Sequence, residues 1–196
     1  MNSNIEYIIG IDPGSVGGIS MVDRDFNLVD AMEMPDRKRD IIQFLIRAKY
    51  EKKYSCSACI EKAQVMAGME GKISMQNYMR EYGRLLGMLD AIGIAYVEVA
   101  PQTWKSRFNL IQRRDPSIPK PTDKKAIAKE RTERKKRGKI MAGKIVESLY
   151  ADMPIHTAEG RLMDGMVESI LIAVYGMERE IGHTISAKEW QGKLAL

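Results

Sequence analysis

This sequence of 196 residues has few of the features that stabilise or target a protein by themselves. It has only two cysteines, Cys56 and Cys59, which excludes a disulfide framework and a zinc site of four thiolates. Its longest apolar run, residues 170–177, is far shorter than the ~18 residues that a membrane-spanning helix needs. The first residues lack the charged and apolar segments of a secretory signal. We therefore expect a soluble protein with no membrane partner, in the cytoplasm.

Positive charge is concentrated in one part of the chain. Residues 105–144 contain 15 Lys and Arg against four acidic residues, whereas the remainder contains 16 against 22. A basic segment on a mildly acidic body is typical of a protein that binds a polyanion, most often nucleic acid, because clustered Lys and Arg neutralise phosphates and release counterions. A solvated charged helix or a disordered arm has the same composition and stays open as the alternative.

The first half of the chain predicts a mixed sheet. Three short apolar runs, at 5–11, 18–22 and 28–34, are separated by turn residues, which favours an antiparallel meander. Helical spacing over 36–50, a strand at 57–62, a helix at about 69–91 and a strand at 94–99 follow. This order predicts an α/β fold with a five-stranded mixed sheet flanked by helices, the outline of a ribonuclease H-like core. The length suits a single domain over 1–196.

The second half predicts a basic helical insert, at about 111–150, before a last helix. A short helix opened by Pro101 precedes a stretch with three prolines, which we interpret as a loop. Thr122 is expected to cap a basic helix that ends near residue 150, and the last helix is expected over about 161–180. Cys56 and Cys59 lie three apart on a strand and so face opposite sides, which indicates two small buried residues.

Two candidate metal ligands end predicted strands. Asp12 stands directly before a turn, where a buried strand would hold its carboxylate at the surface. Its alternative role is to begin an Asp-Pro-Gly turn. Glu61 has apolar neighbours that predict burial, so it needs a cation, a hydrogen-bond network or an escape to solvent.

Two further acids, Asp164 and Glu168, stand four apart and share one face of the last helix. Like charges at this spacing oppose helix formation by ~0.2 to 0.5 kcal/mol, and a bound dication would reverse the penalty. An exposed acidic first turn is the alternative for Asp164. With Asp12 and Glu61 they make a set of hard oxygen ligands that selects Mg²⁺ or Mn²⁺. Two ions ~3.5 to 4 Å apart would support metal-assisted phosphodiester hydrolysis.

Four segments resemble the RuvC family of Holliday-junction resolvases, especially the small phage-type members: IGIDPGSVGG around Asp12, CIEKAQ around Glu61, VAPQTWK ending at Lys105, and DGMVESILIA around Asp164 and Glu168. The resemblance implies a ribonuclease H-like fold, two Mg²⁺ ions on the four carboxylates, and a homodimer on a four-way junction. It also implies that Lys105 contacts the scissile phosphate or a strand backbone. The family places two aspartates three apart in its last helix, whereas an Asp and a Glu stand four apart here.

Several further roles are predicted. Basic residues expected to grip DNA are Lys105, Arg107, Arg113, Arg114, Lys124, Lys125, Arg134, Lys135, Lys136 and Arg137. Residues expected at a dimer interface, on a ridge of small residues, are Tyr82, Gly83, Leu86 and Gly87. Packing of this stripe on the protein's own sheet is the alternative. Trp104 is expected in the core. Met66 and Met69 are candidates for an apolar wedge in an opened junction, and His156 for assisting the acidic site or for a surface role.

The leading hypothesis is a Mg²⁺-dependent endonuclease that resolves Holliday junctions or other branched DNA by paired cuts. One alternative keeps the fold and acts on RNA–DNA hybrids or flaps. Another is a non-catalytic junction-binding protein. An actin-like ATPase also opens with a Gly-rich turn after a strand, but it needs two related lobes, which 196 residues with one such turn do not supply.

Overall fold

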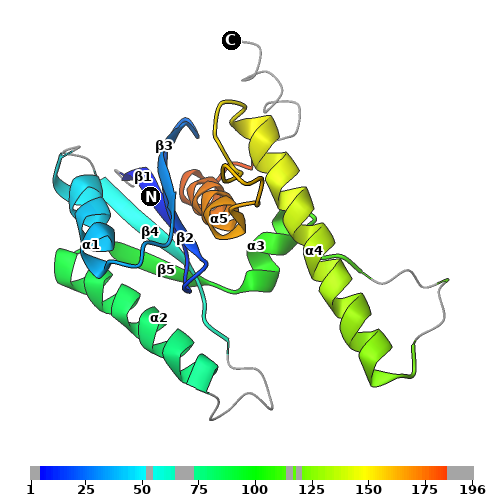
Figure 1. The fold of residues 1–196 in the computed structure, drawn as a ribbon. Helices are drawn as coiled ribbons and strands as arrows, with labels where there is room; N and C mark the ends of the chain where they lie inside the picture. Colours follow the sequence, from blue (N-terminus) through cyan, green and yellow to red (C-terminus); the bar gives the residue numbers. More distant parts are fainter. Residues whose placement is uncertain (1–4, 52–54, 65–72, 114–116, 118–120, 185–196) are drawn as a thin grey trace.

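The computed structural model describes residues 5–51, 55–64, 73–113, 117 and 121–184. It contains one five-stranded sheet in the order β3-β2-β1-β4-β5 (Figure 1). The strands are β1 (Ile5–Asp12), β2 (Gly18–Asp23), β3 (Leu28–Glu33), β4 (Ser55–Glu61) and β5 (Ala95–Val99). β1 to β3 form the predicted antiparallel meander, and β4 and β5 run parallel to β1. The predicted mixed sheet is therefore confirmed.

The register of the parallel strands places two candidate ligands at one edge of the sheet. Ile11 pairs with Ile60 in the β1–β4 ladder, and each is followed by the last residue of its strand. Those last residues are Asp12 and Glu61. Because neighbouring parallel strands end at the same side, the two carboxylates leave the sheet next to each other.

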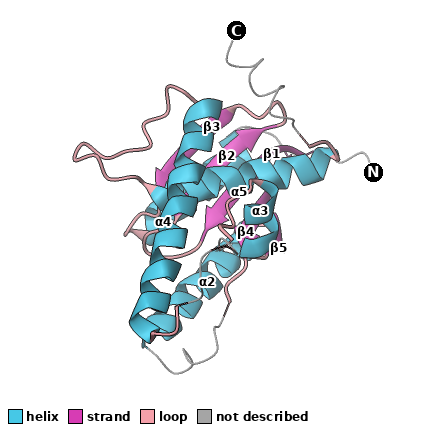
Figure 2. Ribbon diagram, turned by 90° about the vertical axis from the view of Figure 1, so that its right-hand side faces the viewer, coloured by secondary structure: helices cyan, strands magenta, loops and turns pink. Residues whose placement is uncertain are grey.

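Each face of the sheet carries its own core. Helix α5 (Asp164–Ile181) packs on the face that includes Ile8 and Cys59. Helices α1 (Lys38–Ile46) and α2 (Ile73–Ile92) cover the face that includes Ile9 and Cys56 (Figure 1). α5 lies across the opposite face, with the strands behind it in Figure 2. The two cysteines are therefore buried on opposite sides, as predicted. A π-helical turn, η1 (Arg47–Glu51), extends α1.

The start of α5 lies against the turn after β1 because glycines allow a close backbone approach. A Cβ added to Gly165 would stand 2.0 Å from the carbonyl oxygen of Val16, and one on Gly18 would stand 2.6 Å from the carbonyl oxygen of Gly165. No side chain fits in either place. Gly165 weakens helix propensity, but it brings Asp164 and Glu168 to the edge of the sheet where β1 ends.

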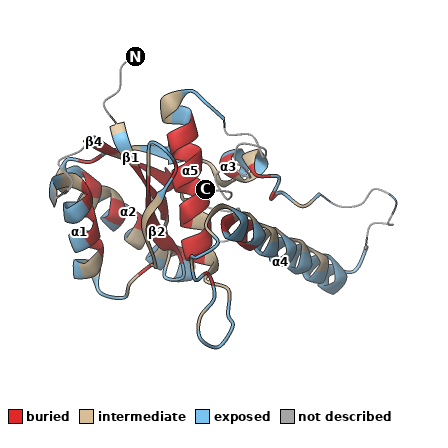
Figure 3. Ribbon diagram, turned by 90° about the horizontal axis from the view of Figure 1, so that it is seen from above, coloured by how far each residue is buried: buried red, intermediate tan, exposed pale blue. Residues whose placement is uncertain are grey.

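The remaining helices are α3 (Pro101–Arg107) and α4 (Lys124–Leu149). α4 extends away from the sheet, and most residues of its outer half are exposed, apart from the half-buried Glu130 and Arg134 (Figure 3). Its cap is Asp123, whose carboxylate accepts from the Ala126 N–H at 2.9 Å, so the predicted cap at Thr122 was wrong by one residue. Of the helices in the described ranges, none is long and apolar enough to span a membrane.

α5 begins at Asp164 and not near residue 161 as predicted. Leu162 forms an isolated bridge with His156, and the Met163 N–H donates to the Ile155 carbonyl. Arg161 makes a two-pronged ion pair with Glu33, at 3.0 and 2.9 Å. These contacts hold residues 161–163 in an extended form, which overrides their helical pattern.

Candidate active site

Asp12 is buried among other carboxylates, which disfavour its ionised form. Burial at the end of β1 raises the pKa of its carboxyl well above the ordinary value, and the nearby Glu168 and Glu61 raise it further. The Lys105 ammonium opposes them, and Asp164 adds a smaller rise. The charges of Glu168, Glu61 and Asp164 all act on the Asp12 carboxyl, so the four predicted carboxylates are electrostatic neighbours although they come from β1, β4 and α5.

Glu61 is held by two partners from α3. Trp104, which is fully buried as predicted, donates its indole N–H to Glu61 Oε2 at 2.8 Å. Lys105 Nζ lies 3.8 Å from the same oxygen. Burial raises the pKa of Glu61, while Lys105 and the Trp104 hydrogen bond lower it. Of the three ways to stabilise a buried Glu61, the described residues supply the cation and the hydrogen bond.

Lys105 lies between two of the carboxylates. Its ammonium donates to Glu168 Oε2 at 2.8 Å and stands 4.9 Å from the centre of the Trp104 ring. Burial acts to lower the pKa of Lys105, but the attraction of Glu168, Glu61 and Asp12 outweighs it, so the pKa is raised. Lys105 therefore neutralises part of the acidic cluster.

Asp164 has its own basic partner, which the sequence-based reasoning missed. Lys139 of α4 pairs with Asp164 Oδ2. α4 was predicted to bind DNA, but Lys139 was not among the residues chosen. Its signal in the sequence is only its place in the basic run, because nothing local indicates which turn of α4 meets α5.

The chemistry of the site fits a hard divalent cation. All four candidate ligands offer carboxylate oxygens, which suit Mg²⁺ or Mn²⁺. In the described part of the chain, however, no three His, Cys, Asp or Glu side chains are arranged as a ready ligand set. The Lys105 and Lys139 ammoniums pair with Glu168 and Asp164 instead. The carboxylate oxygens suit Mg²⁺ or Mn²⁺ as ligands. For Glu168 and Asp164 to bind an ion, Lys105 and Lys139 must first break their ion pairs with them.

A groove of about 680 Å³ connects this site with the basic face of α4. Lys105 and Glu168 line one end. The basic residues that line it along α4 are Arg131, Arg134, Lys135 and Lys139. Arg134 also pairs with Glu130 at 3.6 Å. The groove gives a polyanion a path from α4 to Lys105 and Glu168.

The other predicted DNA-binding residues differ in placement. Arg113, Lys124, Lys125, Lys136 and Arg137 are exposed, and Arg114 lies outside the described residues. Arg107 instead forms a forked ion pair with Glu178, at 2.9 and 2.5 Å. Glu178 is buried in α5, so this pair fastens α3 to α5.

The predicted dimer residues also divide into two groups. Tyr82 is buried in the core of its own chain, and its hydroxyl donates to Glu98 Oε2 at 2.5 Å. Leu86 is half-buried and packs against the same core. Gly83 and Gly87 are exposed, with no described atom within 4 Å of an added Cβ. Of the four residues predicted at the dimer interface, only Gly83 and Gly87 lie on open surface.

Three further predictions concern isolated residues. His156 is half-exposed, with Nδ1 3.9 Å from Glu147 Oε1. Met66 and Met69 lie outside the described residues. Tyr78, which was not predicted, lies beside the carboxylates: burial raises its pKa to about 12, with smaller contributions from Glu61 and Asp12. Tyr78 was missed because its place in an apolar stripe of the predicted helix indicates only that the ring packs against the protein.

Comparison with known proteins gives a structural likeness and no sequence match. No protein-family model and no curated protein sequence matches the chain. A structure of Thermus thermophilus RuvC in complex with a Holliday junction substrate is similar, with 11% identity, a TM-score of 0.50, and coverage of 90% of this chain and 96% of that one. A second Thermus thermophilus RuvC structure is 12% identical over the same shares, with a TM-score of 0.49. The first likeness shows that the chain has the ribonuclease H-like fold of RuvC, as predicted.

Proposed function

We propose that this protein is a metal-dependent endonuclease that cuts four-way or branched DNA junctions by phosphodiester hydrolysis. The proposal is supported by the position of Asp12, which feels the charges of Glu61, Asp164 and Glu168 at the edge where β1 and β4 end, and by the basic groove that Glu168 lines. Metal-assisted hydrolysis of a phosphodiester uses both parts: carboxylates that hold the ions beside the reacting phosphate, and basic side chains that hold the strand.

The four carboxylates are the residues that would hold Mg²⁺ or Mn²⁺, two ions in each site. When bound, such ions lower the pKa of a water and stabilise the charge on the leaving oxygen. The chain supplies the positioning. The β1 scaffold fixes Asp12, the Trp104 N–H orients Glu61, and the packing of α5 on the glycines presents Asp164 and Glu168.

Lys105 and Lys139 have a second role in this proposal. Their ammoniums neutralise Glu168 and Asp164 in the protein alone, which makes the acidic cluster tolerable without ions. Both lysines also line the groove. Once the carboxylates hold cations, the ammoniums are free to bind phosphate oxygens of the strand, with Lys105 nearest to the reacting group.

The exposed basic face of α4 supplies affinity without sequence readout. Phosphate contacts from Lys and Arg depend on salt and carry little base information. A four-way junction has two-fold character and needs two matched cuts, so we include a homodimer in the proposal. Gly83 and Gly87 on α2 are the residues left open for its interface.

The test compares binding and cutting of a synthetic immobile four-way junction. Asp12→Asn keeps the shape of the side chain but removes the charge, so we expect junction binding to persist and nicking to be lost. Asp90→Asn, at an exposed position of α2, is the matched control and should nick at the wild-type rate. An Asp12→Asn protein that nicks as fast as the wild type refutes the proposal.

A non-catalytic junction-binding protein is the second candidate. It is favoured by one observation: Lys105 and Lys139 satisfy Glu168 and Asp164 without any ion. The same assay separates the two candidates. Wild-type protein that binds the junction but does not nick it in Mg²⁺ or Mn²⁺ would establish the second. An RNA–DNA hybrid of the same sequence, run in parallel, tests for the hybrid-cutting alternative.

A further inference from the structure

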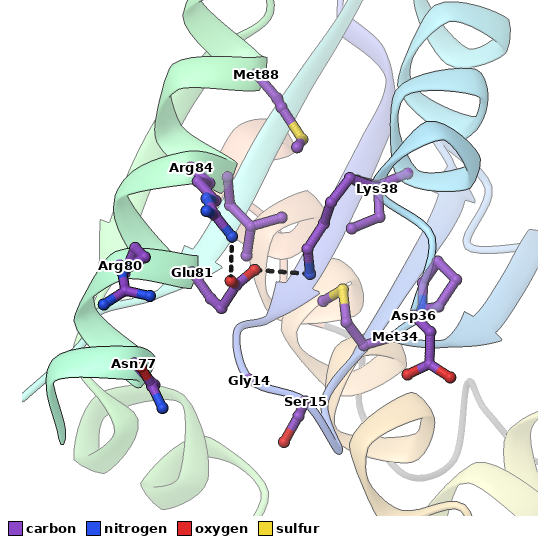
Figure 4. Close-up of a pocket in the computed structure, with 13 residues that line it drawn as sticks. Gly14, Ser15, Met34, Asp36, Lys38, Asn77, Arg80, Glu81, Arg84 and Met88 are labelled. Carbon is purple, nitrogen blue, oxygen red and sulfur yellow. Dashed lines mark hydrogen bonds and ion pairs between the residues drawn. The ribbon is translucent and has the colours of Figure 1, made fainter. Parts of the chain in front are cut away.

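A second cavity lies on the other side of the turn that follows Asp12. It has a volume of about 390 Å³ and is set between α1 and α2 (Figure 4). Gly14 and Ser15 of the turn form one wall, and the link from β3 to α1 forms another. This volume is within the range of small-molecule sites. We call this cavity the α1–α2 cleft.

The α1–α2 cleft combines an apolar surface with a charged rim. Met34, Ile41, Leu85 and Met88 supply the apolar part. Across the opening, Glu81 accepts from Lys38 Nζ at 2.6 Å and from Arg84 Nη1 at 2.5 Å, as the dashed lines in Figure 4 mark. This bridge joins α1 to α2 above the apolar residues.

Two more polar side chains line the cleft on the α2 side, Asn77 and Arg80. Arg80 is exposed, and Figure 4 draws no interaction for its guanidinium with the other lining residues. The lining carries three cationic side chains, Lys38, Arg80 and Arg84, against two carboxylates, Glu81 and Asp36. An apolar ligand would make no use of the Arg80 guanidinium, and a bare anion would leave the apolar surface unused. A nucleotide, with a flat base and an attached phosphate, uses both.

The α1–α2 cleft is joined to the candidate active site through Tyr78. A Cβ on Gly14 would stand 3.7 Å from Tyr78 Cε2, so the ring packs against the turn after Asp12. Tyr78 is also close enough to Asp12 and Glu61 to be affected by their charges. Its neighbour Asn77 lines the cleft. One turn and one ring therefore separate the cleft from the carboxylates.

We propose that the α1–α2 cleft holds one unstacked nucleotide of the strand that is cut, adjacent to the cleaved phosphate. The base lies against Met34 and Met88, and Arg80 binds the neighbouring phosphate. Removing a base from the stack costs least where pairing is already broken, as at a branch point. The cleft thereby favours branched over continuous DNA. This inference rests on the proposed function, because it assumes that the same edge of the sheet cuts DNA.

The test places the fluorescent base 2-aminopurine next to the branch of a four-way junction, since its emission rises when it leaves the stack. Saturating wild-type protein should raise the emission several-fold. A protein with Arg80→Ala and Arg84→Ala should lose at least half of that rise. Arg39→Ala removes an exposed arginine of α1 that does not line the cleft, and should behave as wild type. Asn77→Ala changes the cleft wall without changing its charge, and it should also reduce the rise in emission.

The outcomes separate this inference from the proposed function. A rise in emission that the double variant and Asn77→Ala lose, without any nicking in Mg²⁺ or Mn²⁺, refutes the nuclease and supports nucleotide binding in the cleft. Nicking with the same emission from the wild type, the double variant and Asn77→Ala refutes the cleft and leaves the nuclease. Failure to bind branched DNA refutes both.

Discussion

Helices α5 and α4 contact each other, yet they differ in how much of each is buried. Thirteen of the 18 residues of α5 are buried, whereas only three of the 26 residues of α4 are, and these lie near its C-terminal end. α5 delivers Asp164 and Glu168, and α4 delivers Lys139. The comparison teaches that the carboxylates are placed by tight packing, whereas most of the cations sit on a helix that packing barely restricts.

The largest expected effect comes from disturbing the packing of α5 on β1, which should destabilise the fold. A Cβ at Gly10 would stand 2.1 Å from the Ser169 carbonyl oxygen and 2.4 Å from the Ala173 nitrogen. We expect Gly10→Val to lower the free energy of unfolding by about 3 kcal/mol, as measured by urea denaturation. Ala91→Val, at an exposed position of α2, is the control and should lower the free energy of unfolding by less than about 1 kcal/mol. Equal stabilities for both variants would show that α5 is not close-packed on β1.

A smaller change sharpens the contrast within the site. Trp104→Phe keeps an aromatic ring in the core but removes the N–H that donates to Glu61. Partners that orient metal ligands are worth about 10- to 100-fold in metal affinity or activity. We expect a fall of that size in the nicking rate, partly restored by higher Mg²⁺ concentration. Tyr150→Phe, which removes a hydroxyl that donates to the Phe26 carbonyl away from the site, is the matched control. A Trp104→Phe protein with an unchanged Mg²⁺ dependence would mean that the hydrogen bond serves only the fold.

Changes on α4 should act on affinity and leave the fold alone. Lys135→Ala removes one cation from the groove. We expect the slope of log affinity against log salt concentration to fall by about 1, with unchanged urea unfolding. Lys144→Ala, on an exposed part of α4 that does not line the groove, should leave the slope as it is. Equal slopes for the two variants would remove the groove from the DNA path.

The smallest effect concerns the partly exposed Glu81 of α2, which pairs with Lys38 and Arg84. Hydrogen bonding to Lys38 and the charges of Lys38 and Arg84 lower the pKa of Glu81 from its ordinary value of 4.5. Its contribution to stability is therefore complete above the unfolded value and is lost as the pH falls through the lowered folded value. Because the group is largely solvated, we expect Glu81→Gln to cost less than about 1 kcal/mol at pH 7 and nothing at the acidic end. A cost that persists at low pH would contradict this.

The sequence predicted the sheet and the sheet-borne half of the site because both depend on local patterns. Asp12 and Glu61 each follow an apolar strand, and parallel register brings such strand ends together. Contacts between elements far apart in the chain were not predictable in this way. The Arg107–Glu178 and Lys139–Asp164 pairs depend on how α3 and α4 pack on α5. The burial of Tyr82 depends on which face of α2 meets the sheet, and its stripe alone left two answers open.

The most direct test of the central claim maps nicks on an immobile four-way junction with and without Mg²⁺, beside a linear duplex of the same sequence. We predict two symmetric nicks near the branch that require the ion, and no nicks in the duplex. Absence of nicks in both Mg²⁺ and Mn²⁺, or equal cutting of the duplex, would contradict the claim that the carboxylates at this edge of the sheet cut branched DNA.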